Sequence, residues 1–155
     1  LIKIVEKYHL QPSALRRLFL IYEPDELLAE NLSLRLKMTK KNRQLFFCWA
    51  TTDVPLREFL NPESLNKLIY TYGKEFCVDK LMLQIALELT EVDKIVEIID
   101  YINSYEVPVF PLRGRDIVEH GVSESSQIGT ILKNLENRWI ESNFKLDGEQ
   151  LLRAL

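Results

Sequence analysis

The residues of this chain best suited to hold a phosphate group lie in the stretch RGRDIVEHGVSESSQIG, residues 113–129. Arg113 and Arg115 flank Gly114 at a predicted helix start, where free backbone N–H groups and the positive end of the helix dipole attract anions. Gly121 is predicted to close this short helical turn in the left-handed conformation that glycine adopts without strain. The sequence therefore predicts a phosphate site beside Arg113, Gly114 and Arg115.

Gly129 lies within the first two turns of the next predicted helix, where glycine costs about 1 kcal/mol relative to alanine. A glycine in such a place allows a close approach by another backbone, either of the protein or of a nucleic acid. Two alternatives remain open. The stretch could be a compact helical hairpin that needs no ligand, and Arg115 could pair with Asp116, Glu119 or an acid elsewhere in the chain instead of with phosphate.

A second group of cations, the basic run RLKMTKKNR, has five positive charges and no acid between residues 35 and 43. Its charged members are Arg35, Lys37, Lys40, Lys41 and Arg43. The net charge of the chain is −3, and residues 88–106 hold six acids against one lysine. Such asymmetry predicts one basic face and one solvated acidic face. On charge alone, the basic run is interpreted as an ordinary solvated connection between two helices, and the alternative is a surface that attracts an anion.

No pattern for catalysis or metal binding is recognisable in the sequence. His9 and His120 belong to no HExxH or HxxxH pair, and there is no CxxC motif, P-loop, GxSxG elbow or DxD pair. Cys48 and Cys77 lie in apolar surroundings, which indicates reduced thiols and a cytoplasmic protein. No apolar run reaches the roughly 20 residues that span a bilayer. We therefore expect no catalytic residue, no metal, no cofactor and no membrane contact in this chain.

The elements that must position these residues are helices. Apolar residues recur at helical spacing in nearly every segment, and about eight helices are predicted, so the fold class is all-α. Asn61-Pro62-Glu63 and Pro24-Asp25-Glu26 are helix-start signals. Residues 76–89 are apolar almost all round, as expected of a central buried helix.

The predicted helices form a multi-helix array in two parts. Two prolines in EVPVFPLR, residues 106–113, indicate a linker after the acidic segment. We therefore predict a helical body at residues 1–106 and a smaller helical tail at residues 107–155, which contains the hairpin bracketed by glycines.

The predicted tail resembles the C-terminal signature of bacterial tRNA nucleotidyltransferases, the CCA-adding enzymes, whose class also includes bacterial poly(A) polymerases. The matching positions are Pro111, Gly114, Arg115, Asp116, Ile117, Gly121, Ile128, Gly129, Leu132 and Trp139. Upstream, LSLRLKMTKKNRQLF and LNKLIYTYGKEFCVDKLML are similar to the body helices of that family, especially of its α-proteobacterial-like branch. One departure is Ser125-Ser126, where many relatives have Gly-Pro.

The resemblance implies an enzyme with a catalytic head, a neck that templates CTP and ATP, and a helical body and tail that hold the acceptor and T arms of tRNA. This chain would be the body and tail, non-catalytic by itself. Mg²⁺, CTP and ATP are implied only for the missing head and neck. The implied partners are tRNA, whose phosphates the basic run is expected to face in the intact enzyme, and the protein's own head and neck. The alternatives are the same region of a poly(A) polymerase, and a helical protein-interaction scaffold that docks through residues 88–106.

Overall fold

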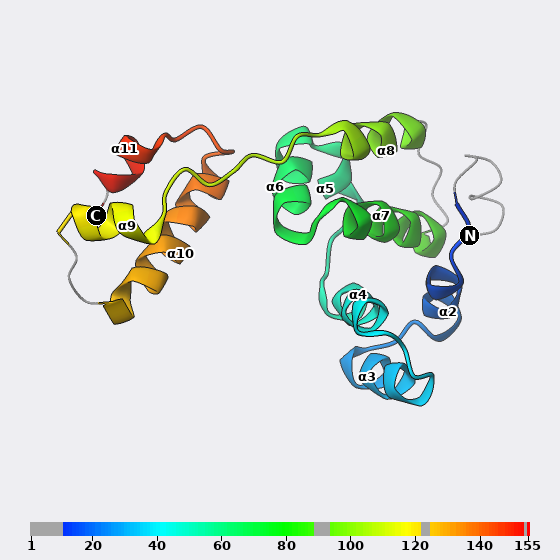
Figure 1. Cartoon of the computed structure of the whole chain (residues 1–155). Helices are drawn as coiled ribbons and strands as arrows, with labels where there is room; N and C mark the ends of the chain where they lie inside the picture. Colours follow the sequence, from blue (N-terminus) through cyan, green and yellow to red (C-terminus); the bar gives the residue numbers. More distant parts are fainter. Residues whose placement is uncertain (1–10, 89–93, 122–124, 154) are drawn as a thin grey trace. The chain divides into compact units, whose positions relative to one another are not determined.

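The computed structural model describes residues 11–88, 94–121, 125–153 and 155. Within these ranges it contains ten α-helices and no β-strand, which confirms the predicted all-α class (Figure 1). The number exceeds the expected eight because two of the helices, Leu56–Leu60 and Gly148–Leu152, hold only five residues each. By its internal contacts the chain divides into two compact units, the N-terminal unit Leu1–Tyr105 and the C-terminal unit Glu106–Leu155.

Seven helices make up the described part of the N-terminal unit. They are α2 (Ala14–Tyr22), α3 (Glu26–Arg35), α4 (Lys40–Thr51), α5 (Leu56–Leu60), α6 (Pro62–Tyr72), α7 (Lys74–Glu88) and α8 (Ile95–Ser104). The start of α6 is the predicted one, because the Asn61 side chain accepts hydrogen bonds from two N–H groups of the first turn and Pro62 is the first helical residue. The predicted start of α3 is also confirmed, since the Asp25 carboxylate caps its first turn.

Helix α7 is the centre of the core of the N-terminal unit. It packs against α2, α4, α5, α6 and α8, and α3 packs in turn on α4. The buried apolar side chains of α7 are Phe76, Cys77, Leu81, Met82, Leu83 and Ile85. The sequence predicted a central buried helix here, and the contacts of α7 on many sides explain why residues 76–89 are apolar almost all round. Burial of each large apolar side chain stabilises the fold by about 1.5–3 kcal/mol.

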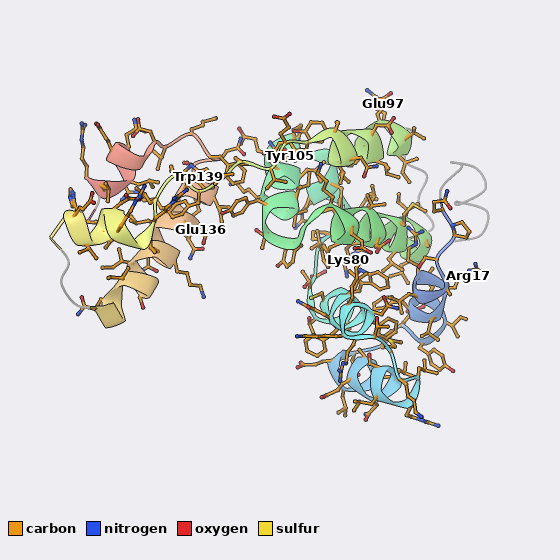
Figure 2. All side chains as sticks on the ribbon, viewed as in Figure 1. Arg17, Lys80, Glu97, Tyr105, Glu136 and Trp139 are labelled. Carbon is orange, nitrogen blue, oxygen red and sulfur yellow. The ribbon has the colours of Figure 1, made fainter. Side chains whose placement is uncertain are left out.

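Two polar side chains of α7 fix the connection that follows α4. The Lys80 ammonium lies between α7 and α4 and donates a hydrogen bond to the Trp49 carbonyl at 2.8 Å (Figure 2). The Gln84 amide donates to the Val54 carbonyl, also at 2.8 Å. Burial lowers the pKa of Lys80, and the negative charge of Asp53 partly offsets this effect. The bond from Lys80 satisfies a carbonyl that the end of α4 leaves without a helical partner.

A third polar contact joins α2 to α7. The Arg16 guanidinium forms an ion pair with Asp79 at 3.1 Å, and the two side chains are only 6% and 15% exposed. Burial raises the pKa of Asp79 from 3.8 to about 6, while the positive charge of Arg16 acts in the opposite direction. The charged form of Asp79 is therefore costly in the folded protein, and Arg16 reduces that cost.

The described part of the C-terminal unit holds three helices around a small core. They are α9 (Gly114–Glu119), α10 (Ser125–Glu141) and α11 (Gly148–Leu152). The Trp139 ring packs edge-on against Phe110 and Phe144, with ring centroids 5.4 and 4.9 Å apart. The other buried side chains are Leu112, Ile117, Leu135 and Leu151. Gly121 follows α9 with a φ of +103°, so the prediction of a positive φ at this glycine is confirmed.

Candidate nucleic-acid interface

The basic run forms the connection between α3 and α4. Arg35 is the last residue of α3, Lys37 lies in the turn, and Lys40 is the first residue of α4. Lys41 and Arg43 follow in the first turn of α4. All five side chains are exposed. The structure thus gathers the five cations on one short segment at the surface of the N-terminal unit.

Lys37 occupies the left-handed position that ends α3. Its φ is +49°, its N–H donates to the Leu34 carbonyl at 3.1 Å, and the Met38 N–H donates to the Ser33 carbonyl at 3.0 Å. In this Schellman arrangement glycine is the usual residue, because a side chain costs about 1–2 kcal/mol in the left-handed conformation. The chain therefore carries a positive charge at this turn at some expense of stability.

The first turn of α4 concentrates positive charge. It contains three cations and no acid, although the N-terminus of a helix is already the positive end of its dipole. The Thr39 hydroxyl accepts a hydrogen bond from the Asn42 N–H at 3.2 Å and caps one of the free donors. An external anion near this turn would be attracted by the cations and by the helix dipole together.

One of the five cations has an acidic neighbour within the described residues. Nζ of Lys41 lies 2.7 Å from Oε2 of Glu75 on α7, and the two side chains are 71% and 59% exposed. Pairs at the surface contribute at most about 1 kcal/mol. The other four, Arg35, Lys37, Lys40 and Arg43, form no ion pair within the part of the chain that the structure describes. Their charges are available to an external anion.

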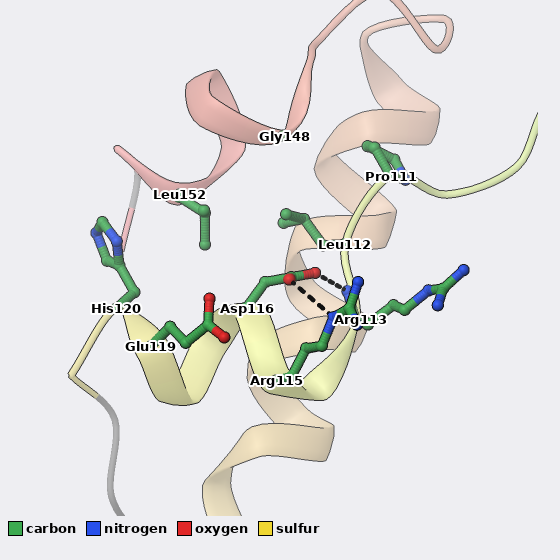
Figure 3. Close-up of a pocket in the computed structure, with 9 residues that line it drawn as sticks. All are labelled: Pro111, Leu112, Arg113, Arg115, Asp116, Glu119, His120, Gly148 and Leu152. Carbon is green, nitrogen blue, oxygen red and sulfur yellow. Dashed lines mark hydrogen bonds and ion pairs between the residues drawn. The ribbon is translucent and has the colours of Figure 1, made fainter.

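In the C-terminal unit, Arg113 and Arg115 line a pocket of about 530 Å³ (Figure 3). Arg113 immediately precedes α9, and Arg115 is the second residue of that helix. The other lining residues are Pro111, Leu112, Asp116, Glu119, His120, Gly148 and Leu152. The pocket therefore combines both arginines of the sequence motif with an imidazole and two carboxylates.

The Asp116 carboxylate occupies the start of α9. One oxygen accepts a hydrogen bond from the Arg113 N–H at 2.6 Å, and the other lies 3.5 Å from Nε of Arg115. In Figure 3 the Arg115 side chain bends back toward Asp116, whereas the Arg113 side chain extends away from it. The contact with Arg115 is the pairing that the sequence left open as an alternative to phosphate. Because the Arg115 side chain is largely exposed, this contact is weak.

The capping role of Asp116 is the feature of this site that sequence analysis missed. Its signal was an acid at the third position of a short helix, where the carboxylate reaches the N–H group just before that helix. With Asp116 in this place, the N–H of Arg113 is already bonded, so Arg113 offers its guanidinium rather than its backbone to a ligand.

The two glycines of the predicted site differ in their surroundings. A Cβ atom on Gly114 would lie 3.6 Å from Cγ2 of Ile128, which is an ordinary contact. A Cβ atom on Gly129 would meet no described atom within 4 Å, and the residue lies exposed on α10. No described part of the chain thus approaches Gly129 closely, and an approach by nucleic acid stays a prediction.

Metal-ligating side chains do not cluster in the described ranges, where no group of three or more His, Cys, Asp or Glu residues could hold an ion. His9 lies outside these ranges, and His120 lines the pocket beside α9. Among the helices that the structure describes, none is long and apolar enough to cross a membrane.

Comparison with known proteins gives matches to proteins of one name. No protein-family model matches the sequence. The chain is similar to the protein named CCA tRNA nucleotidyltransferase 1, mitochondrial, of Homo sapiens, with 26% identity over 140 residues, and to that of Mus musculus, with 26% identity over 132 residues. Each match covers 78% of this chain. The Danio rerio protein of the same name is 30% identical over 70 residues, or 45% of this chain.

These similarities support a relationship to CCA-adding enzymes, the relationship that the motif of the C-terminal unit indicated. The chain spans 28% of the length of the human and mouse proteins and 16% of the zebrafish protein. The similar proteins are vertebrate and carry the word mitochondrial in their names, so a bacterial origin and a cytoplasmic location stay predictions from the sequence.

Proposed function

We propose that this chain is the tRNA-holding C-terminal region of a CCA-adding tRNA nucleotidyltransferase. The observation that carries the proposal is the group of exposed cations at the α3–α4 connection, four of which are unpaired within the described residues. Similarity to CCA-adding enzymes over 78% of the chain supports tRNA as the polyanion. Recognition would proceed through shape and phosphate contacts, as is usual for double-helical RNA.

In this proposal the chemistry belongs to another part of a longer protein. The human and mouse relatives are more than three times as long as the region they share with this chain. A catalytic head would bind Mg²⁺ and the incoming nucleotide, and a neck would select CTP or ATP. The segment described here would hold the acceptor and T arms and would transfer no nucleotide by itself.

Contact with such a head and neck needs an apolar surface, and α3 offers one. Leu27 and Leu34 lie seven residues apart, hence on the same face of α3, and both are exposed. Ile21 at the end of α2 is exposed as well. Exposed apolar groups that share one helix face, as Leu27 and Leu34 do, are typical of surfaces that another domain covers.

The salt dependence of tRNA binding tests the proposal. We expect the chain to bind a tRNA transcript that lacks its 3′ CCA, with an affinity that falls steeply as salt rises, because phosphate contacts release counterions. The double variant Lys40→Ala/Arg43→Ala should bind more weakly and lower the slope of log affinity against log salt by up to about 2, or about 1 per lost contact.

The matched control removes two cations from α5 and from the residue before α8, in the variant Arg57→Ala/Lys94→Ala. This variant has the same net charge as the test variant and should keep the wild-type slope. If the two variants weaken tRNA binding and lower the salt slope equally, the basic run acts only as ordinary surface charge. If the chain does not bind tRNA but binds a protein partner with an affinity that does not change with salt, the scaffold alternative is favoured.

A further inference from the structure

A small pocket lies beside the basic run, between α4 and the junction of α6 with α7. Its volume is about 180 Å³. Its lining residues are Lys41, Gln44, Leu45, Cys48, Tyr72, Glu75 and Phe76. Lys41 is a member of the basic run, so one cation belongs both to the proposed phosphate surface and to the rim of this pocket.

The pocket has an aromatic wall. The rings of Tyr72 and Phe76 are stacked, with their centroids 4.7 Å apart and their planes 28° from parallel. Phe76 is buried, whereas Tyr72 is 41% exposed. Tyr72 ends α6, and Gly73, with a φ of +84°, turns the chain so that α7 brings Phe76 back against it. Phe76 thus holds in place a ring that is partly open to an external partner.

Polar groups stand at the edge of the same pocket. The Gln44 carboxamide offers both a donor and an acceptor, and it forms no hydrogen bond within the described residues. Lys41 and Glu75 form their exposed ion pair at the rim. Because a surface pair is worth little, a ligand can displace it at small cost.

We propose that this pocket binds an unpaired nucleobase of the RNA that the basic run holds, with the base stacked against Tyr72 and its edge facing Gln44. This inference rests on the proposed function. A base suits the pocket because it is planar and apolar on its faces, carries donors and acceptors at its edge, and is attached to a phosphate that the adjacent cations attract. An aliphatic side chain of a protein partner would fill the apolar part but would make no use of the donor and acceptor of Gln44.

The variant Tyr72→Leu tests the stacking. It should weaken binding of the tRNA transcript about tenfold, the usual loss when a base loses an aromatic partner. It should leave the salt slope unchanged, because stacking releases no counterion. Tyr72→Phe keeps the ring and should bind almost as the wild type does. An affinity of Tyr72→Leu equal to that of the wild type would overturn the proposal and would leave the phosphate role of the basic run intact.

A second measurement uses the unmodified chain and does not depend on how the variant folds. AMP, CMP, GMP and UMP are added separately at millimolar concentration while the aromatic NMR signals of Tyr72 and Phe76 are followed. Shifts of these two rings with at least one nucleotide are expected, and inorganic phosphate should not reproduce them. Absence of such shifts would overturn the base site. If the nucleotides shift these two signals but the chain does not bind tRNA, the result contradicts the proposed function and supports a nucleotide pocket.

Discussion

At the scale of single residues, several features of the chain carry a cost to folding. Lys37 holds a left-handed backbone conformation that suits glycine, and three cations share the positive end of α4. At the contact of α2 with α7, Asp79 keeps a carboxylate where partial burial opposes its charge. The first two features lie at the surface and suit an external anion, whereas the third is internal and can be examined without any ligand.

The raised pKa of Asp79, which pairs with Arg16, makes the folded protein less stable as the pH rises. The pKa of Asp79 is about 6 in the folded protein against 3.8 for the ordinary group. The folded state therefore binds a proton that the unfolded state has lost, and this contribution to stability disappears as the pH rises through about 4 to 6. Arg16→Met removes the charge that lowers this pKa. The ionised form of Asp79 then destabilises the folded protein more than it does in the wild type.

We expect Arg16→Met to destabilise the N-terminal unit by about 3 kcal/mol at pH 7.5 and by less at pH 5, where Asp79 takes up a proton. Urea unfolding at the two pH values measures the difference. Arg17→Met is the matched control, because Arg17 is the exposed neighbour on the same helix, and it should change little at either pH. A loss that is larger at pH 5 than at pH 7.5 would contradict the assignment.

At the scale of elements, two glycines of the C-terminal unit differ in backbone conformation and position. Gly121 has a positive φ, so Gly121→Ala should destabilise the unit by about 1–2 kcal/mol. Gly129 lies in α10, and a Cβ there would meet no described atom within 4 Å. Gly129→Ala should therefore stabilise the unit by up to about 1 kcal/mol.

If RNA approaches Gly129 closely, Gly129→Ala should also weaken tRNA binding several-fold although it stabilises the protein. Thermal melts and tRNA titrations of both glycine variants measure the two effects separately. A Gly129→Ala protein that is more stable and binds tRNA as well as the wild type would remove Gly129 from the predicted interface.

Much of the helical pattern was predictable because its causes are local. The starts of α3 and α6 depend on a capping side chain next to the first turn, and the position of α7 follows from a segment without a polar face. The five-residue helices α5 and α11 were not predictable from periodicity, because each is barely more than one turn long. The pocket around Tyr72 was not predictable either, since it needs α4 to pack beside residues about 30 positions further along the chain.

The candidate site was predictable only as a set of residue types. The charges of residues 35–43 and the two arginines around Gly114 could be read directly from the sequence. Which cation pairs with which acid depends on side-chain geometry, as the contacts of Lys41 with Glu75 and of Arg115 with Asp116 illustrate. Such exposed contacts contribute too little energy to leave a strong signature in sequence.

At the scale of the whole molecule, the chain has two units with separate cores. One core surrounds α7, and the other surrounds Trp139. Trp139→Ala should destabilise the C-terminal unit by about 3–5 kcal/mol, the usual cost of a large cavity. In calorimetry we expect the transition of the C-terminal unit to move down while that of the N-terminal unit stays in place. A single transition that moves to lower temperature as a whole would mean that the two units unfold cooperatively.

The placement of the aromatic residues also has a practical consequence. Trp49 and Trp139 are the two tryptophans of the chain, they are 1% and 3% exposed, and each belongs to a different unit. Every unit thus contains its own built-in fluorophore. In a chain with Trp49→Phe the tryptophan emission would come only from the unit with the arginine pocket, and in a chain with Trp139→Phe only from the unit with the basic run. Quenching on addition of RNA could then be assigned to one half of the protein without an attached dye.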